Sequence, residues 1–278
     1  MSSVIEVRKL SYRYEDDRFA LEGINFTINP GDRLAILGPN GAGKSTLLHL
    51  LAGLKLPTSG RVMIHGLDIG ARKKPAYITG VGILFQDPDD QIFMPTVEED
   101  VAFGPINMGL PAEEVEIRVE AALNATGLSD YRKRIPHHLS LGEKKRVAIA
   151  GVLAMKPDIL LLDEPTANLD PRGRKELIQL LRTLDCTILM ATHDLDSAME
   201  ITDGALLLDR RLLAEGSYPE LLSDPELLTR GNLEMPDIPA LFSRLKATGS
   251  WNGEIPLTTE EAVTSLIAHL SRSEISKT

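Results

Sequence analysis

The sequence predicts an α/β fold that combines a parallel-sheet core, an antiparallel β subdomain, an inserted α-helical subdomain and a small C-terminal appendage. Short apolar runs bounded by Pro and Gly, at residues 34–37, 159–162 and 187–190, are typical of central parallel strands buried on both faces. Alternating segments between residues 4 and 28 predict antiparallel strands. Between residues 98 and 155 the spacing of apolar residues becomes helical.

These patterns divide the chain into a main domain over residues 1–216 and a C-terminal extension over residues 217–278. The helical subdomain is expected at about residues 88–155, inside the main domain. The extension contains helical pieces separated by prolines. Its last helix opens at residues 258–261 with the pattern of a capping box and continues with apolar residues at helical spacing, namely Ala262, Val263, Leu266, Ile267 and Leu270.

Composition narrows the possible functions. The 278 residues carry a formal charge of −10, which opposes a broad electrostatic hold on nucleic acid or anionic lipid, although residues 144–146 could form a local basic patch. The single cysteine, Cys186, cannot form a disulfide framework or a thiolate metal site, which fits a reducing compartment. No apolar run reaches the roughly 20 residues that cross a bilayer. We therefore expect a cytoplasmic chain that binds no nucleic acid and reaches membranes only through protein.

A phosphate-binding loop follows the first predicted core strand. The residues match G-x-x-x-x-G-K-[ST] between a buried strand and a helical run at residues 46–52, which is the context that the motif requires. Backbone N–H groups of the loop converge on phosphate oxygens, the lysine bridges the terminal phosphates and the serine hydroxyl ligates Mg²⁺. The motif predicts a P-loop NTPase core that binds a nucleoside triphosphate with Mg²⁺. Its residues are Gly38, Pro39, Asn40, Gly41, Ala42, Gly43, Lys44 and Ser45, followed by Thr46.

The nucleotide base is indicated by an aromatic residue rather than by a motif. The guanine-reading Asn-Lys-x-Asp pattern is absent, whereas Tyr14, in an early strand, offers a ring on which adenine can stack. Tyr12 is the second candidate for this contact. The alternative for Tyr14 is an edge-strand aromatic that packs on its own sheet. We predict ATP as the nucleotide.

Two acidic residues follow the apolar run at residues 159–162. Carboxylates are unfavourable in a buried position unless a metal or a reaction uses them. Asp163 is suited to hold the Mg²⁺ shell, and Glu164, which is expected to point the other way, to polarise the attacking water. The alternative is a simple turn at the end of a strand. The pair predicts hydrolysis in addition to binding.

The segment between these motifs, at residues 139–146, reads Leu-Ser-Leu-Gly-Glu-Lys-Lys-Arg. It resembles the signature loop of ABC ATPases, which is usually Leu-Ser-Gly-Gly-Gln. The glutamine loop at Gln86, the D-loop at residues 168–170 and the switch histidine at His193 complete the motifs in the family's order. The chain is therefore similar to an ABC-type nucleotide-binding domain over roughly residues 4–216.

The resemblance implies a homodimer with two composite ATP sites. Glu164, His193 and Gln86 would act in catalysis, with His193 as a sensor of the γ-phosphate rather than a base. Ser45, Gln86 and Asp163 would surround Mg²⁺. The partner chain would complete each site in trans with Ser140, Gly142, Glu143 and Asp170.

Two positions of the signature loop depart from the family. Leu141 replaces the first glycine and adds bulk, and Glu143 replaces the glutamine and adds negative charge near a phosphate-binding loop. Gly142, where the backbone would approach phosphate most closely, is retained. We therefore expect a working anion site at the start of the next helix, weakened by these two neighbours.

A more specific resemblance lies after the glutamine loop. Residues 85–93 and 96–105 are similar to the ATPases of energy-coupling factor (ECF) importers, most of all to the cobalt and nickel subfamily. This implies a peripheral position on the cytoplasmic face of the cell membrane, with an integral-membrane scaffold protein and a membrane substrate-binding component as partners. The transported ion, cobalt before nickel, would not contact this chain. Ile92 and Phe93 are expected to form an exposed contact patch, the alternative being a buried structural loop.

Other functions compete with this interpretation. A nickel or vitamin importer of the ECF type would share the same motifs. A soluble ABC ATPase that acts on chromosomes or ribosomes is disfavoured, because the chain has neither an inserted coiled coil nor a second set of motifs. A non-hydrolytic ATP-gated switch would have no need of Glu164 and His193.

Overall fold

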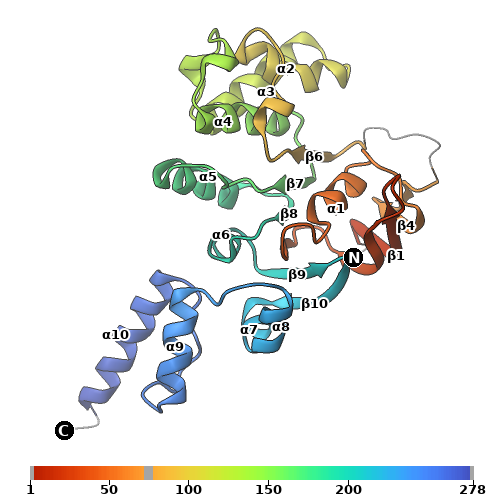
Figure 1. Cartoon of the computed structure of the whole chain (residues 1–278). Helices are drawn as coiled ribbons and strands as arrows, with labels where there is room; N and C mark the ends of the chain where they lie inside the picture. The colour runs from red at the N-terminus through yellow and green to blue at the C-terminus, as the bar shows by residue number, and fades with distance from the viewer. Residues whose placement is uncertain (1–2, 72–77, 276–278) are drawn as a thin grey trace.

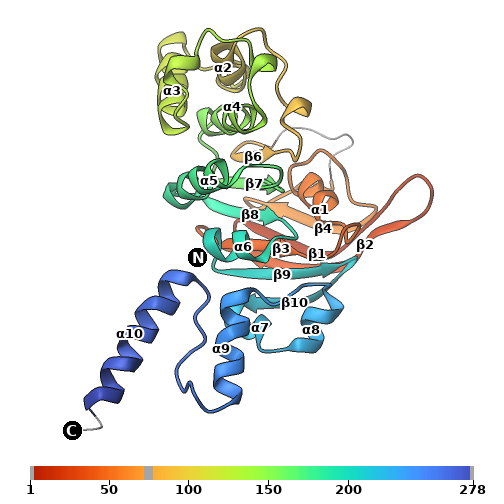
Figure 2. The same ribbon diagram turned by 60° about the vertical axis from the view of Figure 1, so that its left-hand side comes forward.

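The computed structural model describes residues 3–71 and 78–275. Its core consists of two sheets whose apolar faces meet around helix α1 (Figure 1). One sheet is antiparallel, in the order β2-β1-β4-β5, and the other has the order β10-β9-β3-β8-β7-β6 (Figure 2). In the six-stranded sheet all neighbours run parallel except β10, which pairs antiparallel with β9. The predicted fold class is confirmed.

The strands are β1 (Ile5–Arg13), β2 (Phe19–Ile28), β3 (Arg33–Leu37), β4 (Ser59–Ile64), β5 (Leu67–Asp68), β6 (Val81–Leu84), β7 (Ile159–Asp163), β8 (Thr187–Ala191), β9 (Gly204–Asp209) and β10 (Arg211–Ser217). The α-helices are α1 (Lys44–Leu51), α2 (Val97–Asn107), α3 (Ala112–Ala125), α4 (Leu141–Ala154), α5 (Pro171–Thr183), α6 (Leu195–Ile201), α7 (Tyr218–Leu222), α8 (Pro225–Arg230), α9 (Asp237–Ala247) and α10 (Thr259–Ile275). The predicted strands correspond to β1, β2, β3, β7 and β8.

Helix α1 starts where the phosphate loop ends, and its position depends on a glycine. Gly43 precedes the helix with a φ of 97°, and a Cβ atom on it would lie 2.5 Å from the Ala20 carbonyl oxygen of β2. The loop can therefore approach the antiparallel sheet only without a side chain here. Leu47, Leu48 and Leu51 are then buried between the two sheets.

The helical subdomain, α2 to α4, lies at one end of the molecule (Figure 1). Helices α2 and α4 each begin with a capping box, formed by Thr96 with Glu99 and by Ser140 with Glu143. The inner faces of the three helices share one apolar cluster with the six-stranded sheet. This shared core attaches the subdomain to the ends of β6 and β7.

The C-terminal extension has two parts. Tyr218 in α7 and Leu228 in α8 are buried in the main core, and burial raises the pKa of the Tyr218 hydroxyl. Helices α9 and α10 form a separate small cluster around Phe242 and Trp251, at the end opposite the helical subdomain (Figure 2). The division at residue 216 stays a prediction. Among the described residues, no helix is both long and apolar enough to cross a bilayer.

The expected features of α10 are present only in part. The Thr258 hydroxyl accepts a hydrogen bond from the Glu261 amide at 3.2 Å, as in a capping box, but the Glu261 carboxylate accepts from Leu257 instead of Thr258. Of the apolar residues predicted on this helix, Ala262 is buried, whereas Val263, Leu266 and Ile267 are exposed and the side chain of Leu270 lies outside the described ones.

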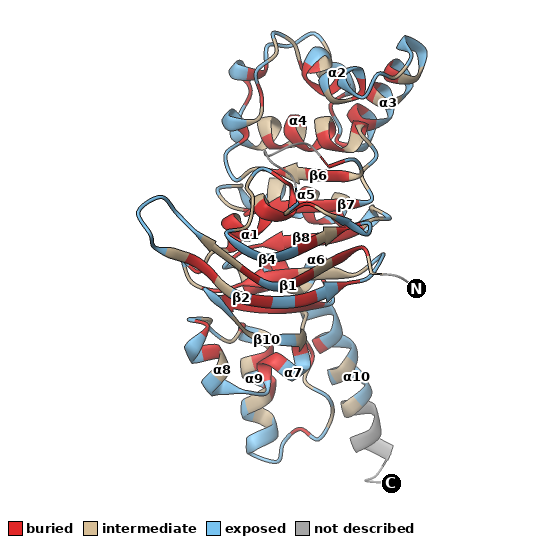
Figure 3. Ribbon diagram, turned by 90° about the vertical axis from the view of Figure 1, so that its right-hand side faces the viewer, coloured by how far each residue is buried: buried red, intermediate tan, exposed pale blue. Residues whose placement is uncertain are grey.

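The expectation that Ile92 is exposed is wrong. Only 2% of its surface is accessible, because it packs into the apolar cluster that the helical subdomain shares with the six-stranded sheet. Figure 3 shows buried positions on α2, α3 and α4 of this subdomain. Phe93 is 57% exposed, as expected, and its ring meets Phe103 of α2 edge to face with centroids 4.7 Å apart. The carboxylate of Asp100 accepts both the Phe93 and Met94 amide protons and so fixes this turn.

These exposures predict opposite effects for two neighbouring substitutions. Ile92→Ser should lower the free energy of unfolding by about 2–5 kcal/mol, because it removes a buried side chain and leaves a hydroxyl in an apolar core. Phe93→Ser should change it by about 0.5 kcal/mol or less, as for other exposed positions. Urea unfolding of both variants measures the difference, and equal destabilisation would place Phe93 in the core as well.

Candidate active site

The phosphate loop connects β3 to α1 with its lysine already in place. Lys44 is buried, and its Nζ donates to the carbonyl oxygens of Gly38 at 2.8 Å and Pro39 at 3.2 Å. Burial lowers the pKa of Lys44, and the negative charges of Glu164 and Asp163 oppose that shift. The Lys44 ammonium group therefore lies beside the loop whose backbone amides can bind phosphate oxygens.

The loop forms one wall of a cleft of 830 Å³. Tyr14 and Glu22 come from the antiparallel sheet side, Glu164 follows β7 and His193 follows β8. Most of the residues predicted to bind or hydrolyse the nucleotide therefore meet in one place. The predicted residues that line this cleft are Tyr14, Asn40, Gly41, Ala42, Gly43, Lys44, Ser45, Thr46, Gln86, Glu164 and His193.

Glu164 is held by two side chains that directly follow β8. Its Oε1 lies 2.9 Å from His193 Nδ1, and its Oε2 accepts a hydrogen bond from the Thr192 hydroxyl at 3.0 Å. When the carboxylate is ionised, His193 Nδ1 carries the hydrogen and donates it. Glu164 is buried, whereas the His193 side chain is 62% exposed and faces the cleft. This arrangement fixes a carboxylate next to the phosphate loop.

Asp163 lines an adjoining cleft of 820 Å³ together with Ser45 and Gln86. Among the described residues, its Oδ1 is the one buried side-chain polar atom without a hydrogen-bond partner. Burial raises the pKa of Asp163, while a hydrogen bond from the Ser45 side chain acts in the opposite direction. A buried carboxylate oxygen beside a hydroxyl and an amide oxygen is the oxygen-rich environment that Mg²⁺ prefers. The three residues predicted to surround Mg²⁺ therefore fit it.

Tyr14 lies at the rim of the first cleft and is 41% exposed. Its hydroxyl is 2.6 Å from the Thr46 hydroxyl of α1, and its ring meets Tyr12 edge to face with centroids 5.3 Å apart. The hydrogen bond fixes the orientation of the ring relative to the phosphate loop. The Lys55 Nζ lies over this ring, 5.7 Å from its centroid. The ring is only partly packed, so a planar base could stack on it, which a fully packed edge-strand tyrosine could not offer.

The residues predicted to act in trans lie elsewhere. Ser140, Gly142, Glu143 and Asp170 line neither cleft of their own chain. Ser140 caps α4, and Asp170 caps α5 by accepting the Gly173 amide proton at 2.8 Å. Within one chain, these four residues are therefore not brought to the phosphate loop, although Leu141 and Lys145 of the same segment line the cleft of Asp163.

The charge of Glu143 is already accommodated in the signature loop. Its Oε2 accepts hydrogen bonds from the Ser140 amide and the Ser140 hydroxyl, both at 2.8 Å. These bonds hold the pKa of Glu143 below its ordinary value. An anion that binds Ser140 must displace this carboxylate. This competition is a physical reason to expect weaker anion binding at the signature loop. Leu141 is 38% exposed beside it.

The local basic patch expected at residues 144–146 is not available to a ligand. Lys144 Nζ pairs with Asp89 at 2.7 Å, and Arg146 pairs with Glu176 at 3.0 Å. Lys145 is buried, with 2% of its surface accessible, and donates to backbone carbonyls beyond Glu164. A run of three basic residues looks the same in a sequence whether it lies in solvent or in a core, so this pairing and burial could not be predicted.

Two further residues near the chemistry had no predicted role. Thr192 bonds Glu164, and its position directly before His193 is the only sequence signal that could have indicated it. His49 of α1 lines the cleft of Asp163, and burial lowers its pKa. A histidine on an apolar helix looks like an ordinary core residue in the sequence.

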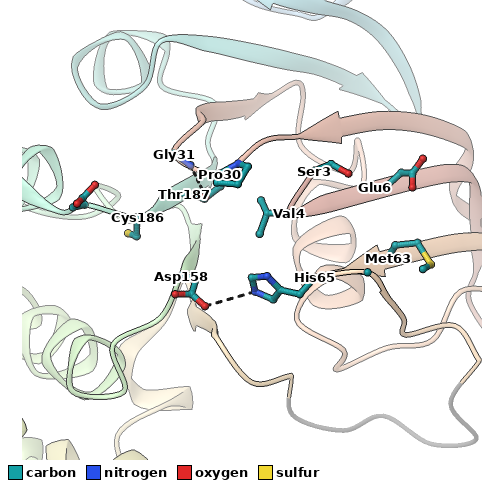
Figure 4. A pocket seen from close by; sticks show the side chains of 12 residues that line it. Ser3, Val4, Glu6, Pro30, Gly31, Met63, His65, Asp158, Cys186 and Thr187 are labelled. Atoms are coloured by element: carbon teal, nitrogen blue, oxygen red, sulfur yellow. Dashed lines mark hydrogen bonds and ion pairs between the residues drawn. The ribbon is translucent and has the colours of Figure 1, made fainter. Parts of the chain in front are cut away.

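Figure 4 shows a third cleft, of 780 Å³, at the other edge of the sheet. Asp158 precedes β7 and Thr187 begins β8, so this cleft lies at the amino ends of the strands whose carboxyl ends carry Asp163 and Glu164. His65 Nε2 stands 3.8 Å from Asp158 Oδ2 here. The cleft is separate from the phosphate loop and takes no part in the candidate site.

Comparison with known proteins matches this geometry. A sequence profile of the ABC transporter family matches residues 21–167. The energy-coupling factor transporter ATP-binding protein EcfA of Methanoculleus marisnigri is 48% identical over 251 residues, which are 88% of this chain and 91% of that protein. The chain belongs to the ABC transporter family. The EcfA of Methanothermobacter thermautotrophicus is 46% identical over 270 residues, which are 95% of this chain and 86% of that protein.

Solved structures of ABC cassettes share the fold. The cbiO1 protein of Clostridium perfringens, described as part of the ABC transporter complex cbiONQ, has a TM-score of 0.70 and 40% identity over 87% of this chain and 100% of its own. A dimeric ATP-binding cassette in a post-hydrolysis state, bound to ADP and Pi, has a TM-score of 0.70 and 28% identity over 77% of this chain and 98% of its own. The predicted ABC resemblance is confirmed, and this ABC-type ATPase uses ATP with Mg²⁺.

The buried carboxylate of Asp163 predicts a conflict between stability and function. Because its pKa is raised in the folded state, the native protein binds a proton more readily than the unfolded chain. The ionised Asp163 therefore lowers the free energy of unfolding to its full extent at pH values above the pKa of Asp163 in the folded protein. This destabilisation disappears as the pH falls below the pKa of Asp163 in the unfolded chain. Asp163→Asn should raise the free energy of unfolding of the nucleotide-free protein by about 0.5–2 kcal/mol at pH 8, and by less at lower pH.

Urea unfolding at several pH values, with and without MgATP, tests this expectation. The variant should also lose the part of the ATP-dependent stabilisation that Mg²⁺ contributes. Equal stability of the variant and the unmodified protein at pH 8 would show that Asp163 is not strained.

Proposed function

We propose that this ABC-type ATPase energises an ECF-type importer as a homodimer at the cytoplasmic face of the cell membrane. The observation that carries the proposal is the contact between Glu164 and His193 across the mouth of the phosphate loop. A carboxylate fixed there by two hydrogen bonds suits the activation of water beside a bound triphosphate. Relatives named as ATP-binding proteins of energy-coupling factor transporters support the importer type.

The geometry supports the following mechanism. The phosphates of ATP lie on the backbone amides of residues 38–46, Lys44 turns from the loop carbonyls to the terminal phosphates, and the adenine stacks on Tyr14. Ser45, Gln86 and Asp163 would hold Mg²⁺, which neutralises phosphate charge when bound.

Glu164 and His193 then act on the attacking water and the γ-phosphate. Glu164 orients and polarises the water through a free lone pair of its carboxylate, while His193 and Thr192 keep that carboxylate in position. The exposed edge of His193 can hydrogen-bond the γ-phosphate, so the same side chain connects phosphate and base. This division of roles favours hydrolysis over a non-hydrolytic switch, for which the Glu164–His193 contact would have no purpose.

Each site is completed by a second copy of the chain. Ser140, Gly142 and Asp170 lie away from the clefts of their own chain, yet Ser140 and Gly142 stand at the start of α4, where backbone amides favour an anion. A symmetric dimer would place these groups against the partner's γ-phosphate. The dimeric cassette bound to ADP and Pi supports this arrangement.

The glutamine substitution at Glu164 tests the catalytic assignment and the dimer together. Glu164→Gln should lower the rate of ATP hydrolysis about 10²–10⁴-fold, because the amide cannot polarise water. Nucleotide binding should survive, so ATP should convert the protein to a dimer that sedimentation detects. Glu200→Gln, on the exposed side of α6, is the matched control and should behave like the unmodified protein. Near-normal turnover or the absence of an ATP-dependent dimer would contradict the proposal.

The surface proposed to receive the membrane scaffold is a groove of 740 Å³ between the helical subdomain and the six-stranded sheet. Phe93, Phe103 and Met108 line one side, and Leu54 with Met155 lines another. Phe93 and Phe103 are 57% and 43% exposed despite being large and apolar. An apolar groove of this kind accepts an amphipathic helix from a partner. It begins next to the glutamine loop, so docking and hydrolysis share one segment.

We propose a transition-metal ion as the transported substrate, with cobalt the first candidate and nickel the second. The support is the resemblance of residues 85–105 to the cobalt and nickel ATPases, together with the structural likeness to cbiO1. A vitamin importer of the same type is the alternative. Copurification of the membrane partners, followed by uptake of ⁵⁷Co²⁺ or ⁶³Ni²⁺ into vesicles, identifies the substrate.

The two exposed phenylalanines test the groove. Phe93→Ser combined with Phe103→Ser should leave folding and basal hydrolysis close to those of the unmodified protein, weaken assembly with the scaffold by about 2 kcal/mol or more, and abolish uptake. Ile117→Ser, at a 52% exposed position on α3 outside the groove, is the control. Normal assembly and uptake in the double variant would exclude the groove as the contact.

A further inference from the structure

Lys145 is the buried cation whose contacts the mechanism does not use. It lies on the second turn of α4, and the Nζ donates to the carbonyl oxygens of Glu164 at 3.2 Å, Pro165 at 3.0 Å and Ala167 at 2.7 Å. An ammonium group has three N–H bonds, so all of them are used on this one loop. The side chain therefore fixes the segment that leads from Glu164 to the D-loop.

The segment needs such a hold because Glu164 has an unfavourable backbone conformation. Its φ is 44°, in the left-handed region, which is strained for a non-glycine residue and persists only where the surroundings enforce it. The Glu164 amide donates to Ala191 on β8, while Lys145 binds its carbonyl from the opposite side. The backbone of Glu164 is thus hydrogen-bonded both to the six-stranded sheet and to the helical subdomain.

Stability alone does not account for a lysine in this position. A buried ammonium is destabilising unless its hydrogen bonds compensate for lost water, and an apolar residue of similar volume is often as stable. Burial lowers the pKa of Lys145 to about 8, against the opposing attraction of Glu164 and Asp87. Removing the Lys145 ammonium group from water is therefore unfavourable. What the lysine provides in this position is three directed hydrogen bonds to the loop that carries Glu164.

We infer that Lys145 is a positioning residue that holds Glu164 in its water-activating geometry and links it to the helix that begins with the signature loop. The inference rests on the proposed catalytic role of Glu164. Ser140, which caps the same helix, is proposed to contact the partner's ATP, whereas Lys145 contacts the hydrolytic loop of its own chain. One rigid helix would then connect the two ATP sites of the dimer.

Substitution with methionine tests the inference in the full-length protein. Lys145→Met keeps the length of the side chain and removes every donor, so kcat should fall about 10²-fold through misplacement of Glu164, while ATP affinity stays within about twofold. Lys145→Gln, with two N–H donors, should have an intermediate kcat. Arg118→Met, which breaks the ion pair with Glu114 on α3 of the same subdomain, is the matched control and should keep its kcat.

A double-mutant cycle separates positioning from general damage. If Lys145 acts through Glu164, adding Lys145→Met to Glu164→Gln should not lower the residual hydrolysis further. A purely structural role would lower it in both backgrounds. Circular dichroism, thermal unfolding and equilibrium ATP binding accompany each rate measurement.

The outcomes are distinguishable from those of the proposed function. Near-normal turnover of Glu164→Gln would refute the role of Glu164 itself. In a second outcome, Glu164→Gln is inactive, while Lys145→Met folds and keeps its kcat within about twofold of that of the unmodified protein. That result would refute only the role of Lys145. If only Lys145→Gln folds, an unchanged kcat in that variant would overturn the inference, and loss of fold in both variants would make Lys145 a stability residue.

Discussion

Two adjacent carboxylates at the buried end of β7 are the constraint on which the rest of the site depends. Charged groups in a protein interior need partners, and the strand order supplies them. Strand β7 lies between β6 and β8, so Gln86 and His193, which follow those strands, end at the same edge of the sheet as Asp163 and Glu164. The phosphate loop follows β3, on the far side of β8, and faces the same edge. The parallel arrangement alone therefore gathers residues more than 100 positions apart, as is general for the carboxyl ends of such sheets.

Helix α4 transmits this constraint to the helical subdomain. Three consecutive basic residues reach three different elements: Lys144 pairs with the loop after the glutamine loop, Lys145 with the loop after β7, and Arg146 with α5. Exposed ion pairs contribute little to stability, but contacts that converge on one helix limit how it can move relative to the core. A displacement of the subdomain by a docked partner would thus reach the loop that carries Glu164 without any intermediate element.

The sequence predicts the site well where chemistry is concentrated in contiguous motifs with a fixed context. The phosphate loop, the Asp163–Glu164 pair and His193 were found because each follows an apolar run that is a buried strand in the structure. Single-residue burial was beyond such reasoning. Ile92 follows an acidic, Pro-broken segment and looks exposed until α2 folds over it, and Lys145 looks solvated until its α4 face is placed against the core. Strands β9 and β10 were not predicted; β9 pairs with the distant strand β3, and β10 pairs with β9 as a hairpin at the edge of the sheet.

The start of α4 is a candidate anion site that lies outside the nucleotide cleft of its own chain. Ser140 and Gly142 stand at a helix start away from their own phosphate loop, and Ser140 is bonded meanwhile to the carboxylate of Glu143. That carboxylate satisfies the amide and the hydroxyl of Ser140 as long as no phosphate is near. Glu143 therefore competes with any anion for Ser140. Only an anion with more charge than one carboxylate, held in the right place by a second chain, would displace the Glu143 carboxylate. In the proposed dimer the terminal phosphate of ATP meets that condition, whereas ADP, once inorganic phosphate has left, presents no γ-phosphate to the loop. In the proposed dimer, the glutamate in place of the family's glutamine would favour release after turnover, and the symmetry of the dimer would apply the same effect to both sites at once.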